Sequence, residues 1–135
     1  FRLREKADYE DFYVLSPEDV ENQLQKASEK MYYSELVDGI LSALQGIAVR
    51  IVLYGSVARG TDARDSDIDI AVFVNSVMTH EMEETLSDVV VDMNLKYDRV
   101  FSVIDIDDNK FHTWLHAIPF YQNIDKEGIV LWKAA

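Results

Sequence analysis

The sequence contains no cysteine, which excludes disulfides, thiolate zinc sites and cysteine nucleophiles together. This absence fits a cytoplasmic protein, and we expect that location. No apolar run approaches the ~20 residues that a membrane-spanning helix needs, so no membrane span is expected. Proline and glycine occur only two and five times, and long loops are therefore not expected.

Basic residues are also scarce. The chain has 13 Lys and Arg against 25 Asp and Glu, a formal net charge of −12. Because phosphate backbones bind basic surfaces, a long nucleic-acid partner is not expected. Most of the acids are expected to be solvated, and only a few can gather around a cation. The 135 residues predict one domain, with an N-terminal arm and helix over 1–46 and a core over 47–135.

The first third of the chain has helical character. Residues 1–13 are polar with scattered aromatics, and we interpret them as an arm that packs on the domain. Ser16 and Pro17 then resemble a helix start, and apolar residues follow at helical spacing. The pattern predicts one long helix, or two stacked ones, ending before Gly46. Its two apolar phases leave open a surface for a partner.

The remainder alternates between strand and helix patterns. Strands are expected at 47–54, 67–74, 99–106 and 127–132, a helix at 80–95, and short helical turns at 57–61 and 111–115. The first two strands are too close for a crossover helix, so a mixed sheet is favoured. The predicted fold class is therefore α/β (α+β): a small mixed sheet of about four strands with helices packed on it and a helical N-terminal extension.

The turn after the first strand has the features of a phosphate site. Gly55 allows a ligand to approach the backbone, and the amides that follow begin a helix, where phosphate is favoured. The hydroxyl of Ser56 can donate to a phosphate oxygen, and Gly60 permits a second tight turn. Arg59 and Arg64 are candidate phosphate partners, although each has an alternative role in pairing with nearby acids.

Two acids open the second strand. Asp67 and Asp69 are two residues apart, so their side chains leave the same face, while Ile68 and Ile70 face the core. Adjacent carboxylates repel unless a cation or proton lies between them. Magnesium bound with a nucleotide usually takes one or two carboxylates plus phosphates. The pair therefore predicts a magnesium site beside the Gly55–Ser56 turn.

Other phosphate motifs are missing, since the sequence has neither Gly-Lys-Ser/Thr nor Gly-x-Gly-x-x-Gly. Gly55-Ser56, ten residues, and then Asp67-x-Asp69 resembles the signature of the DNA polymerase beta-like nucleotidyltransferase superfamily, and of its minimal members most closely. The ending 126–132 and the opening 7–13 are similar to small members of the group as well. The resemblance implies a nucleotidyltransferase fold.

The resemblance also implies roles for these residues. Gly55 and Ser56 would hold the β- and γ-phosphates, and Asp67 and Asp69 would bind magnesium. Such enzymes usually place a third carboxylate on a later strand, where it binds a second metal ion and acts as a base. Asp105 is the candidate here, with Asp107 as the alternative on the same strand face.

The implied activity is transfer of a nucleoside monophosphate, from ATP by preference, to a hydroxyl of a small molecule or a protein, with two Mg²⁺ ions and release of pyrophosphate. The alternative is a catalytically weak nucleotide-binding or antitoxin-like module that masks a HEPN-type partner. A homo-oligomer is left open, and the sequence names neither the acceptor nor the preferred base.

Two further groups have ordinary interpretations. His112 and His116 share a helix face, but a zinc site needs a third ligand, so surface or core histidines are expected. The pair Phe120–Tyr121 and the indole of Trp132 are expected to be core rather than a platform for base stacking.

Overall fold

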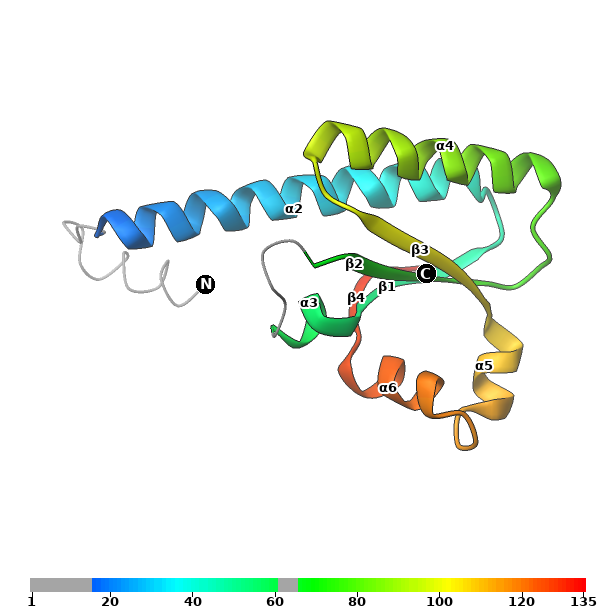
Figure 1. Ribbon diagram of the computed structural model, residues 1–135. Coiled ribbons are helices and arrows are strands. Elements are labelled where there is room, and N and C mark those ends of the chain that lie inside the picture. Colours follow the sequence, from blue (N-terminus) through cyan, green and yellow to red (C-terminus); the bar gives the residue numbers. More distant parts are fainter. Residues whose placement is uncertain (1–15, 61–65) are drawn as a thin grey trace. The chain divides into compact units, whose positions relative to one another are not determined.

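The computed structural model describes residues 16–60 and 66–135 (Figure 1). The chain divides into two compact units, residues 1–31 and 32–135, and the division falls within helix α2 (Pro17–Ala43) rather than at residue 46. A single long helix is one of the two arrangements that the sequence predicted. The hydroxyl of Ser16 accepts a hydrogen bond from the amide of Asp19 at 3.1 Å, which confirms the predicted cap. The predicted arm lies outside the described residues.

The second unit contains a four-stranded mixed sheet in the order β3-β2-β1-β4. Strands β2 and β3 are parallel, whereas β1 pairs antiparallel with both β2 and β4, so the predicted mixed sheet is confirmed. After α2 the elements are β1 (Ala48–Tyr54), α3 (Gly55–Arg59), β2 (Ile68–Val74), α4 (His80–Tyr97), β3 (Phe101–Asp107), α5 (Asp108–Trp114), α6 (Pro119–Glu127) and β4 (Ile129–Lys133).

Helix α6 was not predicted from the sequence. It is only nine residues long, with proline in its first turn, so few apolar positions indicate its helical period. The helix ends at Gly128, whose amide donates to the carbonyl of Ile124 at 2.9 Å. A Cβ on Gly128 would meet that carbonyl and the side chain of Val52, each at 2.5 Å. A side-chain-free residue therefore lets the end of α6 pack closely on β1.

The larger core lies on the sheet face that α4 and the C-terminal part of α2 cover (Figure 1). The strand side chains of this face alternate along β2, and they meet buried helix residues of α2 and α4. The fully or nearly fully buried members include Leu36, Ile40, Ile51, Leu53, Ile68, Ile70, Val72, Met93 and Phe101. At the closest approach of the two helices, a Cβ on Gly39 would lie 2.7 Å from Val89 Cγ1. Glycine therefore permits this helix contact.

A smaller core lies on the opposite face, beneath α5 and α6. Its buried side chains come from three strands and the two helices: Val52, Ala71, Phe73, Ile106, Phe111 and Ile124. The guanidinium of Arg50 lies 4.0 Å from the ring centroid of Phe73 and 5.0 Å from that of Phe111. Arg50 thus packs against two aromatic rings of this core in a cation–π contact.

Helix α4 is capped at its start and hydrogen-bonded to α2 near its end. Thr79 caps its start by accepting from the amide of Met82 at 3.1 Å. Near its end, Lys96 donates to Glu35 of α2 at 2.8 Å and the hydroxyl of Tyr97 donates to the same carboxylate at 2.7 Å. The bonds from Lys96 and Tyr97 lower the pKa of Glu35.

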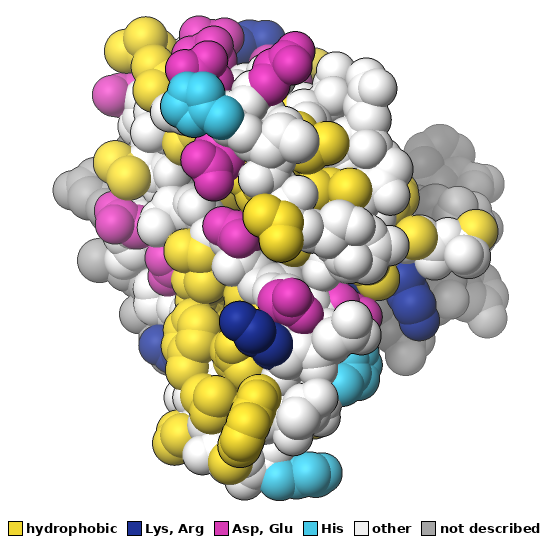
Figure 2. All heavy atoms as spheres, turned by 90° about the vertical axis from the view of Figure 1, so that its right-hand side faces the viewer, with side chains coloured by type: hydrophobic (Ala, Val, Ile, Leu, Met, Phe, Trp, Pro, Cys, Tyr) yellow, Lys and Arg dark blue, Asp and Glu magenta, His cyan; other side chains and the backbone are white. Residues whose placement is uncertain are grey.

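Helix α4 has an acidic outer face. Its exposed acids are Glu81, Glu83, Glu84, Asp88 and Asp92. Figure 2 shows acidic side chains over the upper part of one face of the molecule, and hydrophobic ones gathered over the lower part. None of the described helices has both the length and the apolar character needed to cross a bilayer.

If the C-terminal part of α2 belongs to the domain, Leu36→Ala should lower the free energy of unfolding by about 2–5 kcal/mol, because Leu36 is completely buried. Leu95→Ala is the matched control, since Leu95 is 78% exposed and should change stability by about 0.5 kcal/mol or less. Urea titration of both variants measures the difference. Equal, small effects would show that the core begins after α2.

Candidate active site

Strand β2 carries the central acid of the site. Ile68 and Ile70 point into the larger core and are completely buried, so the residue between them, Asp69, emerges on the opposite face. On that face Asp69 pairs with Tyr54 of β1 and with Ser102 of β3. These register partners are the nearest side chains that the sheet places beside the carboxylate.

Gly55 lies directly against this carboxylate. Its φ of +77° is a left-handed conformation that favours glycine. A Cβ built on Gly55 would collide with the carboxylate of Asp69. The glycine is therefore required twice, once by the turn and once by the close approach of Asp69. This contact brings the predicted turn and one predicted metal ligand together.

The short helix α3 begins at this turn. Its N-cap residue, Tyr54, has extended backbone and makes no side-chain capping hydrogen bond, and Ser56 is the second residue of the helix. Ser56 is half-buried. The helix ends at Gly60, which has a φ of +74° and donates its amide to the carbonyl of Val57 at 3.1 Å. Gly60 thus ends α3, as the predicted second tight turn requires.

Arg59 forms an ion pair with an acid, which is one of the two roles that the sequence predicted for it. Its Nη1 lies 3.1 Å from Oε2 of Glu127 at the end of α6, and both side chains are partly exposed. Its charge also lowers the pKa of Asp69, although other effects on that group are larger. Arg59 therefore lies between α6 and the acid pair, while Arg64 lies outside the described residues.

The environment of Asp69 disfavours its charged form. Burial raises the pKa of this carboxyl, and the negative charge of Asp67, an exposed residue just before β2, raises it further. A divalent cation between the two would relieve both effects, because it replaces lost solvation and separates like charges. Two carboxylates are also as many as magnesium usually takes from a protein when it binds with a nucleotide. The residues present therefore fit such an ion.

Asp105 and Asp107 are not brought to this cluster. Asp105 pairs with Val72 and Asp107 with Val74, on the sheet face that α2 and α4 cover. Asp107 instead caps α5 by accepting from the amide of Lys110 at 3.0 Å. In this register Ser102, rather than either acid, lies beside Asp69, and the role of a third carboxylate on β3 stays a prediction. Over residues 16–60 and 66–135, no group of three or more acidic, histidine or cysteine side chains could hold a metal ion.

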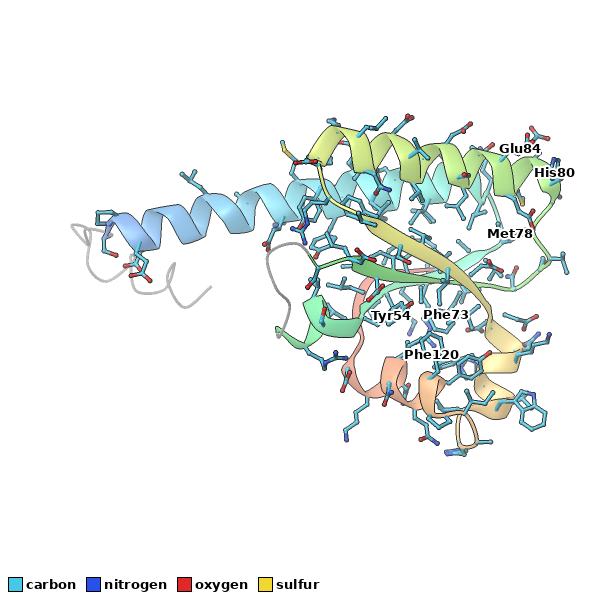
Figure 3. All side chains as sticks on the ribbon, viewed as in Figure 1. Tyr54, Phe73, Met78, His80, Glu84 and Phe120 are labelled. Carbon is cyan, nitrogen blue, oxygen red and sulfur yellow. The ribbon has the colours of Figure 1, made fainter. Side chains whose placement is uncertain are left out.

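Two aromatic residues, Tyr54 beside Asp69 and Phe120 beside Tyr54, were not predicted as site residues. Tyr54 is half-buried, and burial, followed by the charge of Asp69, raises the pKa of its hydroxyl. Its ring meets Phe120 of α6 edge to face, with centroids 5.7 Å apart (Figure 3). Phe120 is 43% exposed, so the prediction that it is core is wrong, whereas Tyr121 and Trp132 do pack against the cores. The position of Tyr54 directly before Gly55 in the sequence was the signal that could have identified Tyr54 as a site residue.

The two histidines are ordinary surface residues. Nδ1 of His112 lies 2.8 Å from the carbonyl of Asp108, and His116 is exposed. Two surface hollows are lined by residues at the start of α4 and near its end. The second includes Val100, whose carbonyl accepts from the amide of Ile68 at 2.8 Å at the start of β2. The acid pair, the glycine turn and the two rings thus form the candidate site.

Residues 35–135 match the family described as polymerase beta, nucleotidyltransferase. The chain belongs to this nucleotidyltransferase family. The matched region begins within α2 and continues to the last residue, so it includes the sheet and every described element of the site. The protein is therefore a nucleotidyltransferase enzyme.

Similar proteins share this fold. The chain is 29% identical over 105 residues to a curated protein of Methanocaldococcus jannaschii named "Putative protein adenylyltransferase MJ0604", a match that covers 78% of this chain and 99% of that one. It also resembles the crystal structure of a toxin–antitoxin with AMP-PNP (TM-score 0.52, 21% identity, 76% of this chain and 73% of that chain). A mutant of the toxin–antitoxin MntA–HpeT gives a TM-score of 0.53 at 19% identity, with 76% and 73% covered.

The raised pKa of Asp69 predicts that Asp69→Asn stabilises the nucleotidyltransferase without metal. A folded-state pKa above the unfolded value means that the folded state binds the proton more tightly, so ionised Asp69 lowers stability at neutral pH. The variant should melt at a higher temperature than wild type in EDTA. The difference should shrink as pH falls through the raised folded-state pKa of Asp69 and should be absent below the unfolded pKa of an aspartate. Asp92→Asn, on the exposed face of α4, should not reproduce it.

A matched glycine pair tests the contact with Asp69. Gly60→Ala should lose about 1–2 kcal/mol of stability from left-handed strain and keep nucleotide binding, because nothing lies within 4 Å of its Cβ position. Gly55→Ala shares the strain and must also displace Asp69, so binding of Mg·ATP should weaken by about tenfold or more. Calorimetric titration measures both. Equal binding by the two variants would show that the carboxylate needs no such contact.

Proposed function

We propose that this enzyme transfers the adenylyl group of ATP to a hydroxyl of a protein and releases pyrophosphate. The observation that carries the proposal is the packing of Asp69 against Gly55, which joins a phosphate-binding turn to a cation-binding acid pair at one point. In the transfer, the acceptor oxygen forms a bond to the α-phosphorus as the bond from that phosphorus to the β-phosphate oxygen breaks. The acceptor hydroxyl gives up its proton to solvent water, and the bridging oxygen leaves with the pyrophosphate.

The residues of the turn bind the phosphates in this proposal. The amides at the start of α3 face the β- and γ-phosphates, since no side chain of the N-cap residue occupies them. The hydroxyl of Ser56 donates to a phosphate oxygen. Arg59 adds positive charge nearby and is oriented by Glu127, which limits its motion. These groups hold the triphosphate so that its α-phosphorus lies at the acid pair.

Asp67 and Asp69 are the residues that would hold Mg²⁺. When bound there, the ion would neutralise phosphate charge and so favour attack on the α-phosphorus and departure of pyrophosphate. The two carboxylates would position that ion against the phosphates, and their mutual repulsion would fall when it binds. The second ion expected from the sequence has fewer protein ligands here, because Ser102 rather than an acid stands beside Asp69.

A protein acceptor is favoured by the name of the Methanocaldococcus jannaschii relative, since 99% of that relative is covered by the match to this chain. The acidic surface, including the outer face of α4, disfavours an acceptor in a nucleic acid. A small-molecule hydroxyl is the alternative acceptor.

A second function is favoured by one specific observation. Since the position beside Asp69 on β3 is a serine, the site lacks a base for the acceptor there. The chain would then bind a nucleotide, catalyse transfer weakly, and act by masking a HEPN-type partner, as an antitoxin does. The two candidates differ in whether the partner's inhibition depends on Asp69.

The proposed site predicts a magnesium-dependent stabilisation by ATP. At about 100 times its dissociation constant, a ligand stabilises by about 2.7 kcal/mol, which raises the melting temperature by several degrees. The shift should vanish in Asp67→Asn and in Asp69→Asn, and transfer of labelled adenylate should vanish with it. Asp105→Asn is the matched control and should retain both, because its side chain lies on the other sheet face.

Loss of activity in Asp105→Asn alone would contradict the site as described. Inhibition of a partner by Asp69→Asn at wild-type strength would favour masking over transfer. No stabilisation of the wild type by any nucleoside triphosphate with magnesium would overturn nucleotide binding itself.

A further inference from the structure

The most unusual exposed side chain near the acid pair is Phe120. Single exposed apolar residues are common and need no explanation by themselves. Phe120, however, is held by two ring contacts, with Tyr54 at 5.7 Å and with Tyr121 at 6.3 Å between centroids. Tyr121 in turn packs against Phe111 in the smaller core, at 5.1 Å. A row of aromatic contacts therefore fixes a ring that stays 43% exposed.

The rings of Tyr54 and Phe120 form a corner. Their planes are 84° apart, so a flat group lying on the face of one ring meets the other ring at its side. Figure 3 shows Phe120 reaching from α6 toward Tyr54 at the end of β1. The corner presents carbon rings and one phenolic hydroxyl. It suits a planar, uncharged aromatic group better than a phosphate or a charged side chain.

This corner lies one residue from the phosphate turn. Tyr54 directly precedes Gly55, and it is the register partner of Asp69, so the side chains of Tyr54 and Asp69 leave the sheet about 5 Å apart. Phe120 lies one ring further along the same face. A nucleotide whose phosphates contact the turn and the acid pair can therefore reach the corner with its base.

We propose that Tyr54 and Phe120 form the platform on which the nucleobase of the nucleoside triphosphate stacks. The inference rests on the proposed nucleotide-binding function and adds the part of the site that holds the base. Stacking on an aromatic ring is sequence-tolerant, because every base has a π-face. The platform therefore contributes affinity for the nucleoside part of the substrate and little choice among bases.

Helix α6 couples the platform to the phosphate site. The ion pair between Arg59 and Glu127 joins α3 to the end of α6, while Ile124 anchors the helix in the smaller core. Phe120 stands in the first turn of the same helix. The ring is thus placed by packing rather than by the nucleotide, so its removal should affect the base contact and leave the phosphate contacts intact.

The test compares two probes that share the phosphates and differ in the base. The dissociation constants of Mg·ATP and of Mg·tripolyphosphate are measured by calorimetry for wild type, Phe120→Ala and Phe120→Trp. Phe120→Ala should raise the dissociation constant of Mg·ATP by about tenfold or more and change that of Mg·tripolyphosphate by less than about twofold. Phe120→Trp, which keeps a stacking ring, should bind ATP close to wild type.

Trp114→Ala is the matched control, because Trp114 is a 52% exposed aromatic on α5. It should change neither constant, and melting curves confirm that each variant is folded. Unchanged ATP binding in Phe120→Ala would overturn the platform while leaving the proposed function standing, and a transfer defect alone would assign the corner to the acceptor. Equal weakening of both probes would also overturn it, as a phosphate effect. Failure of wild type to bind tripolyphosphate and ATP would instead overturn the proposed function.

Discussion

The close approach of Asp69 to Gly55 is the constraint on which the site depends. It fixes the distance between the strand that carries the acids and the turn that begins α3. A larger residue at the turn would separate the two, and a right-handed conformation would redirect the helix. Because the same glycine also follows Tyr54, this one contact sets the positions of the phosphate, cation and aromatic parts of the site relative to one another.

The period-two alternation of strands then decides which side chains can take part. Strand β2 lies inside the sheet, so its side chains on both faces are buried or half-buried. Asp69 is the polar exception on one of these faces. The parallel register with β3 carries that choice to the next strand, where it selects Ser102 and excludes Asp105. A shift of one residue along β3 would place Phe101 or Val103 beside Asp69, so neither neighbouring register brings Asp105 beside it.

The sequence predicted the elements whose signals are local. The β-branched run ending at Gly55, the alternation from Asp67 and the apolar stripe of α4 each determine an element over a few residues, and all three are confirmed. The strand register is a long-range property, so Asp105 could not be excluded without coordinates. Likewise, the exposure of Phe120 depends on where α6 packs, which is also a long-range property that the sequence of this short helix does not contain.

The repulsion between Asp67 and Asp69 has a consequence for the lifetime of the chain. Proteases cut the opened state of a protein, and its population rises as the folded state loses stability. A pair of acids that disfavours its own charged form makes the unliganded fold open more often than its core alone would dictate. Any divalent ion and phosphate that settle there reduce this opening. The enzyme should therefore resist proteolysis better with bound substrate than without it.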